Sequence, residues 1–408
     1  MPILSVFKST VLLLFLLFSS CRGQEDSTKK HMVDTKNDSL SEVKVAANRI
    51  SAYLHLLKDN DIGVVANQTS VIFKKAGNTH LVDSLISLNV NIKKVFAPEH
   101  GFRGKADAGE VVKDGVDTKT GLPIVSLYGK NKKPSKEQLQ DLDIVVFDIQ
   151  DVGVRFYTYI ATLQLVMEAC AENDIPIIVL DRPNPNAGYV DGPTMKKEHT
   201  SFLGMTTIPL VYGMTIGEFA KMINTEGWLT DGVIADLTII PIENYNRNTD
   251  YSLSIRPSPN LPNDTSIHLY PSLGLFEGTN VNAGRGTEFQ FQRYGASFLD
   301  STQYDFSYVP QPNFGSKYPK EEGKICFGSD LSKEKRMNIM SLKWLIDAYT
   351  NTSDKSKFFK TESFTKHSGT PELQKQIEAG LSEDEIKATW QEELETFKAI
   401  RKKYLIYD

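Results

Sequence analysis

The chain has 408 residues, of which 40% are hydrophobic and 24% are charged, and its formal net charge is −5. These values are ordinary for a globular protein, and the length suits about two domains. A negative net charge disfavours a nucleic-acid partner, because proteins that bind nucleic acid usually carry a basic surface. No run beyond residue 25 is apolar for long enough to span a bilayer.

The first 21 residues are predicted to be a secretory signal. Lys8 precedes an apolar run at 11–18, and two serines then lead to Cys21. A basic start, a short apolar core and small residues before a cut site are typical of such signals. The cysteine after small residues also resembles a bacterial lipoprotein processing site. We therefore expect an exported protein, a periplasmic or outer-membrane lipoprotein held by acyl chains on Cys21, with a plain signal peptide as the alternative.

The remaining chain divides into three predicted parts. Residues 22–45 are polar and charged and nearly lack large apolar side chains, which predicts a disordered tether. An α/β pattern begins at residue 46. Proline and asparagine become frequent after about residue 250, so we place a domain boundary between 46–263 and 264–408.

Short apolar runs alternate with helical patterns through the first domain. This alternation predicts a parallel sheet with right-handed crossovers. Two helices carry capping boxes, at Ser135 with Gln138 and at Thr215 with Glu218. Strands are expected at 62–69, 92–97, 123–129, 143–151, 175–181 and 235–242, and helices at 46–57, 81–88, 160–172 and 215–228.

The sequence predicts neither a cofactor nor a metal. No Gly-x-Gly-x-x-Gly follows the first strand and no Walker loop is present, which disfavours nucleotide cofactors. The spacing of His, Cys, Asp and Glu fits neither zinc nor calcium. Cys170 and Cys326 lie in apolar runs and are expected to be buried thiols. A last long helix is expected at 383–403, with an apolar stripe that includes Trp390 and packs in the core.

Charged and polar side chains gather after four predicted strands or loops. The carboxyl ends of parallel strands face one edge of a sheet, so these groups are expected to share a pocket. The four groups are Glu99, His100 and Arg103; Asp148, Gln150, Asp151, Arg155 and Tyr157; Asp181, Arg182, Asn184 and Asn186; and Glu277, Asn280, Arg285 and Thr287.

Two carboxylates and aromatic side chains suit the hydrolysis of a glycosidic bond. One carboxylic acid protonates the leaving oxygen, and the other acts as nucleophile or as base on water. Tyr157 and Tyr159 are candidates to stack on the face of a sugar. These residues also have structural interpretations: Asp148 as a cap or as the ion-pair partner of Arg155, Arg155 as a residue that holds its own strand end in place, and Glu277 as a solvated loop carboxylate.

Several motifs, in this order, resemble the NamZ-type exo-β-N-acetylmuramidase family over residues 46–408. The resemblance implies a Rossmann-like domain, a smaller α+β C-terminal domain, a cleft between them, and release of N-acetylmuramic acid (MurNAc) from the non-reducing end of peptidoglycan fragments. The motifs are Ala97-Pro-Glu-His-Gly-Phe-Arg-Gly104, Phe147-Asp-Ile-Gln-Asp-Val-Gly-Val-Arg-Phe-Tyr-Thr-Tyr159, Leu180-Asp-Arg-Pro-Asn-Pro185, Leu275-Phe-Glu-Gly-Thr-Asn280 and Gly284-Arg-Gly-Thr287.

The resemblance also suggests roles for particular residues. Glu99 lies in the Pro-Glu-His-Gly motif and is expected to be the general acid, and Glu277 is the weaker candidate for the second carboxylate. The acetamido group of the substrate is an alternative to a protein nucleophile. The lactyl carboxylate of MurNAc requires a cation, for which Arg103, Arg155 and Arg285 are candidates.

Two other classes of function compete with a glycosidase. A lipid-anchored protein that binds wall sugars without cleaving them would use the same aromatic and arginine side chains. An esterase or amidase is the weaker alternative, because no Gly-x-Ser-x-Gly elbow is present.

Overall fold

A computed structural model describes residues 42–104 and 114–408. The expected signal, Cys21 and nearly all of the expected tether lie outside the described residues. Within the described ranges, every helix is too short or too polar to cross a membrane. Residues 41–408 form one compact unit.

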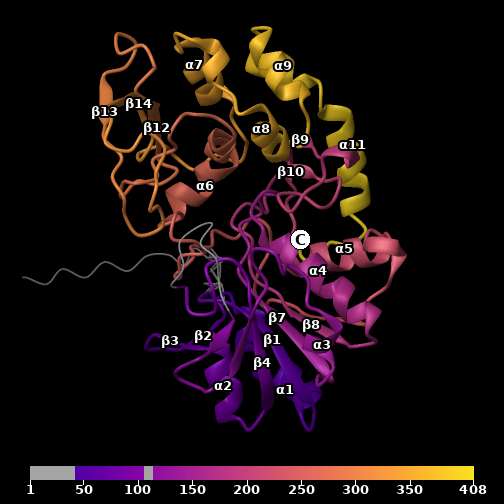
Figure 1. Cartoon of the computed structure of the whole chain (residues 1–408). Coiled ribbons are helices and arrows are strands. Elements are labelled where there is room, and N and C mark those ends of the chain that lie inside the picture. Colours follow the sequence, from indigo (N-terminus) through magenta and orange to yellow (C-terminus); the bar gives the residue numbers. More distant parts are fainter. Residues whose placement is uncertain (1–41, 105–113) are drawn as a thin grey trace, which may run out of the picture. The chain divides into compact units, whose positions relative to one another are not determined.

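A seven-stranded sheet organises the first part of the chain, and all neighbours in it are parallel except β5 and β6. The six parallel strands follow the doubly wound order typical of Rossmann folds, with the reversal of direction beside β1. Strands β4, β1, β7 and β8 stand side by side in Figure 1. In spatial order the strands are β11 (Leu237–Ile240), β8 (Ile177–Leu180), β7 (Ile144–Asp148), β1 (Asp61–Ala66), β4 (Asn91–Ala97), β6 (Pro123–Ser126) and β5 (Gly115–Val116).

Both faces of this sheet are buried, because alternate strand residues point to opposite sides. Val64 and Val146 belong to one core with residues of α1 (Ile50–Leu57) and α2 (Leu81–Ser87). Val65 and Val145 belong to the other core, with α4 (Tyr159–Glu172) and α5 (Ile216–Thr225). The continuous apolar strands predicted from the sequence are therefore confirmed.

The second core continues into a smaller C-terminal domain of helices and a three-stranded antiparallel sheet, drawn in orange and yellow in Figure 1. Its strands are β12 (Arg293–Ala296), β14 (Cys326–Asp330) and β13 (Phe306–Tyr308). Its helices are α6 (Asp264–Leu273), α7 (Lys343–Thr350), α8 (Thr361–Ser368), α9 (Glu372–Glu378), α10 (Glu383–Ala388) and α11 (Gln391–Arg401). This α/β architecture with an added small domain is the predicted fold class.

Short elements connect these parts. Strands β9 (Asp191–Thr194) and β10 (Pro209–Val211) form an antiparallel pair, as do β2 (Val71–Phe73) and β3 (Asn78–His80). The remaining elements are α3 (Lys136–Leu139) and the 3-10 turns η1 (Ala46–Asn48), η2 (Lys197–His199), η3 (Thr230–Gly232), η4 (Gly274–Gly278) and η5 (Lys355–Lys357).

The single long helix expected at 383–403 is wrong. The structure has α10 and α11, separated at Trp390, whose φ of −107° and ψ of 1° are not helical. The change of direction lets Ile386 on one helix and Leu394 on the other both reach the core, with Trp390 buried between them. The assignment of this apolar stripe to the core is confirmed. Cys170 and Cys326 are buried free thiols, as expected.

Residues 406 and 407 return to the large sheet. The Tyr407 hydroxyl donates to Asp181, just after β8, over 2.6 Å. The backbone N–H of Ile406 donates to Glu218 Oε1 over 2.7 Å. Burial raises the pKa of Asp181 to about 6, and the hydrogen bond from Tyr407 opposes that rise. These contacts place the last stretch of the chain against the end of a central strand.

The predicted capping box of α5 is present, and its Thr215 side chain is also bonded to the carboxylate of Asp181. The Glu218 N–H donates to Thr215 Oγ1, and Thr215 Oγ1 donates to Asp181 over 2.8 Å. Thr215→Ala should lower the free energy of unfolding by about 1–2 kcal/mol, because it removes the cap and a buried bond. Urea unfolding measures this loss. Thr215→Ser keeps the oxygen and should recover most of the stability, and equal losses in both variants would contradict the capping role.

Candidate active site

Glu99 lies two residues beyond the end of β4 and is half-buried. The Tyr128 hydroxyl donates to its Oε1 over 3.0 Å, and Thr158 Oγ1 donates to its Oε2 over 3.2 Å. Thr158 is the N-cap of α4, and Tyr128 follows β6. Two strand ends and a helix start therefore fix the orientation of this carboxyl group. In the sequence, the strand-end rule and the resemblance of its Pro-Glu-His-Gly motif both pointed to Glu99.

Glu277 belongs to η4, directly after α6, and not to an open loop as expected. Arg285 Nη1 donates to its Oε2 over 3.0 Å. Burial alone would raise the pKa of Glu277, but the charges of Arg285 and Lys320 outweigh it and lower that pKa to about 2. Glu277 is therefore ionised near neutral pH, so it can serve as a nucleophile, base or charge stabiliser but not as the acid.

Tyr270 connects the two glutamates. Burial, followed by the charges of Glu277 and Glu99, raises the pKa of Tyr270, whereas Arg285 lowers it. The Tyr270 ring also packs edge-on against Tyr157, with centroids 6.0 Å apart. Both carboxyl groups thus act electrostatically on one phenol, although 178 positions separate them in the sequence. The pKa of Tyr270 therefore depends on both residues that the sequence proposed as catalytic, and their catalytic roles stay a prediction.

The low pKa of Glu277 predicts a pH dependence of stability. A carboxyl group whose pKa falls from 4.5 to about 2 on folding stabilises the folded state fully above pH 4.5 and loses that effect as the pH falls toward 2. Thermal melting of the wild type and Glu277→Gln from pH 2 to pH 7 tests this. The difference in Tm should be largest at neutral pH and should shrink toward pH 2. A difference independent of pH would show that the charge of Glu277 is not responsible.

Three other predicted site residues are buried and bound to protein atoms. Asp148 is fully buried and pairs with Arg182 Nε at 2.6 Å. Arg155, also fully buried, donates to four backbone carbonyls, at residues 193, 208, 367 and 368. Gln150 donates to the carbonyls of Asp151 and Pro183. Asp148 is therefore in an ion pair, but its partner is Arg182 and not Arg155, the partner suggested by the sequence. Arg155 binds residues near β9 and β10 and at the end of α8 rather than the end of its own strand.

The other predicted site residues also contact protein atoms or are buried. Arg103 pairs with Asp117 at 2.7 Å and with Asp83 at 3.0 Å. His100 is buried, with a positive φ of 71°.

The Tyr157 hydroxyl donates to Pro257 O over 2.6 Å. Asn280 donates through Nδ2 to Lys357 O over 2.6 Å. Of the three predicted arginines, Arg285 directly contacts a candidate catalytic carboxylate, that of Glu277.

Sequence reasoning missed three residues beside the carboxylates. Tyr128 ends the apolar run 123–129, so the strand-end rule would have found it. Tyr270 lies within an unpredicted helix, α6. Lys320 donates to the carbonyls of Phe276 and Glu277 over 2.7 and 3.1 Å from a loop without a distinctive pattern.

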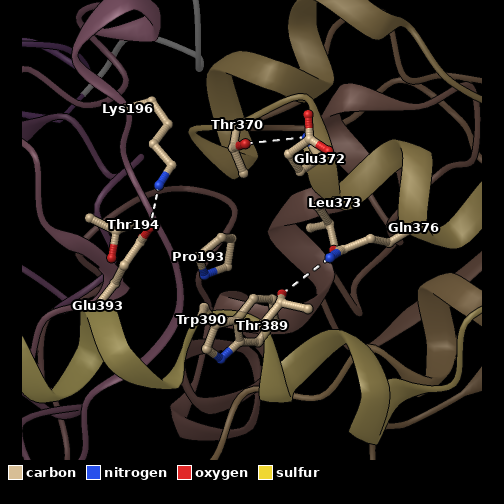
Figure 2. A pocket seen from close by; sticks show the side chains of 10 residues that line it. All are labelled: Pro193, Thr194, Lys196, Thr370, Glu372, Leu373, Gln376, Thr389, Trp390 and Glu393. Carbon is tan, nitrogen blue, oxygen red and sulfur yellow. Dashed lines mark hydrogen bonds and ion pairs between the residues drawn. The ribbon is translucent and has the colours of Figure 1, made fainter.

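A separate pocket of about 210 Å³ lies among β9, α9 and the junction of α10 with α11. Figure 2 shows Lys196 paired with Glu393 on one side and Gln376 bonded to Thr389 on another. No residue of the predicted site lines it. Among the described residues, no group of three or more His, Cys, Asp or Glu side chains is arranged to hold a metal ion.

Two sequence models of one family match the chain. Residues 62–265 match the N-terminal domain of the exo-β-N-acetylmuramidase NamZ, and residues 268–407 match its C-terminal domain. The chain belongs to the NamZ family. Both glutamates that act on Tyr270 fall inside the matched regions, one in each domain of the NamZ family.

Individual NamZ relatives agree with this membership. The peptidoglycan β-N-acetylmuramidase NamZ of Bacillus subtilis strain 168 is 38% identical over 399 residues, which covers 92% of this chain and 94% of the relative. A crystal structure of a DUF1343 family protein from Bacteroides fragilis NCTC 9343 matches with a TM-score of 0.82 and 43% identity, over 90% of this chain and 99% of that one. A second such protein from the same strain matches with a TM-score of 0.75 and 26% identity over the same shares.

Proposed function

We propose that this chain is an exo-acting glycosidase that releases MurNAc from the non-reducing end of peptidoglycan fragments such as MurNAc–GlcNAc. Membership of the NamZ family and the name of the Bacillus relative support the reaction and its substrate. The observation that carries the proposal is the 38% identity over 92% of the chain to a peptidoglycan β-N-acetylmuramidase, with Glu99 and Glu277 as the two candidate carboxyl groups. A glycosidase requires two carboxyl groups of this kind or a substrate that replaces one of them.

Different surroundings suggest different roles for the two carboxyl groups. Glu99 accepts hydrogen bonds from the hydroxyl groups of Tyr128 and Thr158, which hold its carboxyl group in one orientation, as the protonation of a leaving oxygen requires. Glu277 is held ionised by Arg285 and Lys320, which suits stabilisation of the oxocarbenium-like transition state or activation of water. If the acetamido oxygen of the substrate is the nucleophile, Glu277 retains the stabilising role.

The proposed location is outside the cytoplasm, as a periplasmic or outer-membrane lipoprotein of a bacterium held by a lipid on Cys21. The apolar segment at 11–18 and the small residues before Cys21 support export and lipidation. Mass spectrometry of the N-terminal peptide from the full-length protein tests this. An acylated Cys21 is expected, and an unmodified new N-terminus elsewhere would contradict the anchor.

We also propose that the two domains meet at residues 263 and 264. Asn263 caps α6, the first helix of the second domain, by accepting the N–H of Ser266 over 2.9 Å. The parallel sheet is complete before this position, since β11 ends at residue 240.

Product analysis tests the activity. The protein without its first 21 residues is incubated with β-1,4-linked MurNAc–GlcNAc, and the products are identified by mass spectrometry. Free MurNAc and GlcNAc are expected. Saturable binding without products on long incubation would instead identify a protein that captures wall sugars, and neither binding nor cleavage would overturn the assigned substrate.

A further inference from the structure

Positive charge exceeds negative charge around η4. Arg285 pairs with the carboxylate of Glu277, whose charge also acts on Lys320, and the Lys320 ammonium donates to the Glu277 backbone carbonyl. Lys360 adds further positive charge that acts on Lys320. His367, which also faces Glu277, contributes little charge near neutral pH, because burial lowers its pKa. The described residues thus leave this cluster with a net positive charge that a bound anion would balance.

The same cations have hydrogen-bond donors to spare. Arg285 uses Nη1 for Glu277 and Nη2 for the carbonyl of Gly315, but its buried Nε has no acceptor. Lys320 directs two of its three N–H bonds to the carbonyls of Phe276 and Glu277. No acceptor for the third is found among the described residues. A buried donor without an acceptor, such as Arg285 Nε, destabilises a protein, and the remaining N–H of Lys320 is available to an acceptor on a ligand.

The other candidate cations near Glu99 are already satisfied. Arg103 pairs with Asp83 and Asp117. Arg155 is completely buried, and its guanidinium group donates to four backbone carbonyls. Lys320, in contrast, is only partly buried and can be reached by a ligand. An anionic group of a ligand in this site would therefore be drawn to the Lys320 side of Glu277.

We propose that Lys320, supported by Arg285, recognises the lactyl carboxylate of the terminal MurNAc and so distinguishes this sugar from GlcNAc. This inference rests on the proposed function, because it assumes that MurNAc binds between Glu99 and Glu277. The carboxylate balances the net charge and accepts the spare N–H of Lys320. GlcNAc has no lactyl group, so it neither balances the positive charge nor accepts the remaining N–H of Lys320.

The test compares 4-nitrophenyl β-MurNAc, whose lactyl group carries a negative charge, with its lactyl methyl ester, in which that group is neutral. Lys320→Met should lower kcat/KM for the acid by about 10- to 100-fold, the usual effect of losing a charge-assisted hydrogen bond. The value for the ester should change less than about twofold. Lys320→Arg should retain most of the activity on the acid. Lys324→Met, on the same segment but largely exposed, should leave both substrates unaffected.

The outcomes separate this inference from the proposed function. If Lys320→Met lowered kcat/KM equally for the acid and the ester, the proposed role of Lys320 would be wrong, but the protein would still be a glycosidase. No cleavage of the acid by the wild type would overturn the proposed function itself.

A test on the wild type covers the case in which the variant does not fold. Burial lowers the pKa of Lys320 to about 8, so KM for the acid should rise above pH 8 while KM for the ester stays constant. Glu277 is already ionised and His367 already neutral in that range, and Arg285 and Lys360 are the other charges that face Lys320. A parallel rise for both substrates would contradict the inference.

Discussion

Glu99→Gln should lower kcat for release of MurNAc from MurNAc–GlcNAc by about 100- to 10,000-fold, the usual contribution of a general acid. Glutamine has nearly the same shape, and its amide accepts from one of the two hydroxyl groups of Tyr128 and Thr158 and donates to the other, but it cannot transfer a proton to the leaving oxygen. Release of free MurNAc, measured by mass spectrometry over time, gives the rate.

Two controls make the result specific to the carboxyl group. The Tm of Glu99→Gln should stay within a few degrees of the wild type, since the side chain is only half-buried. Tyr128→Phe removes one orienting bond and should reduce kcat far less than loss of the acid does. Unchanged turnover in Glu99→Gln would assign the acid to another residue. Glu277 is a poor substitute for that role, because it is ionised near neutral pH.

Arg182→Met should lower the free energy of unfolding by about 3–5 kcal/mol, because it leaves a buried carboxylate without its partner. Only 2% of the Arg182 side chain is exposed, and none of the Asp148 side chain. Arg182 also donates to the carbonyl of Val71 over 3.1 Å, so its loss affects β2 as well as β7. Urea unfolding monitored by circular dichroism measures the change.

A surface ion pair gives the matched control. Arg336 pairs with Asp250, whose side chain is 92% exposed, so Arg336→Met should cost no more than about 1 kcal/mol. The double variant Asp148→Leu with Arg182→Met removes both buried charges and should recover much of the stability. A small loss in Arg182→Met, comparable to that of the surface control, would show that Asp148 is neutral or hydrated in the fold.

The sheet was predictable because its information is local. Each parallel strand is a short apolar run, and burial on both faces makes that run continuous, as at 143–151. Capping boxes depend on residues three positions apart, so those at Ser135 and Thr215 were found correctly. The break between α10 and α11 was missed because it depends on how Trp390 packs against distant elements, which helical periodicity does not encode.

The site was predictable only in part. Glu99 follows a strand, so its position could be read from the sequence. The contacts of Arg103 could not, because Asp83 and Asp117 come from a helix and from a turn of the chain that no local pattern connects with it. Lys320 was missed for the same reason: only the tertiary structure brings its loop to the carbonyls of η4.

The return of residues 406 and 407 to the sheet bears on the order in which the protein assembles. Tyr407 and Asp181 lie 226 positions apart, so their hydrogen bond closes a very long loop of chain. Until that contact forms, Asp181 and Glu218 lack donors that the finished fold provides from this stretch. A chain emerging gradually from a ribosome or an export channel thus cannot complete the end of β8 until nearly the whole sequence has appeared. The hydrogen bonds at the end of β8 are therefore among the last to form, although the strands of the central sheet come early in the sequence.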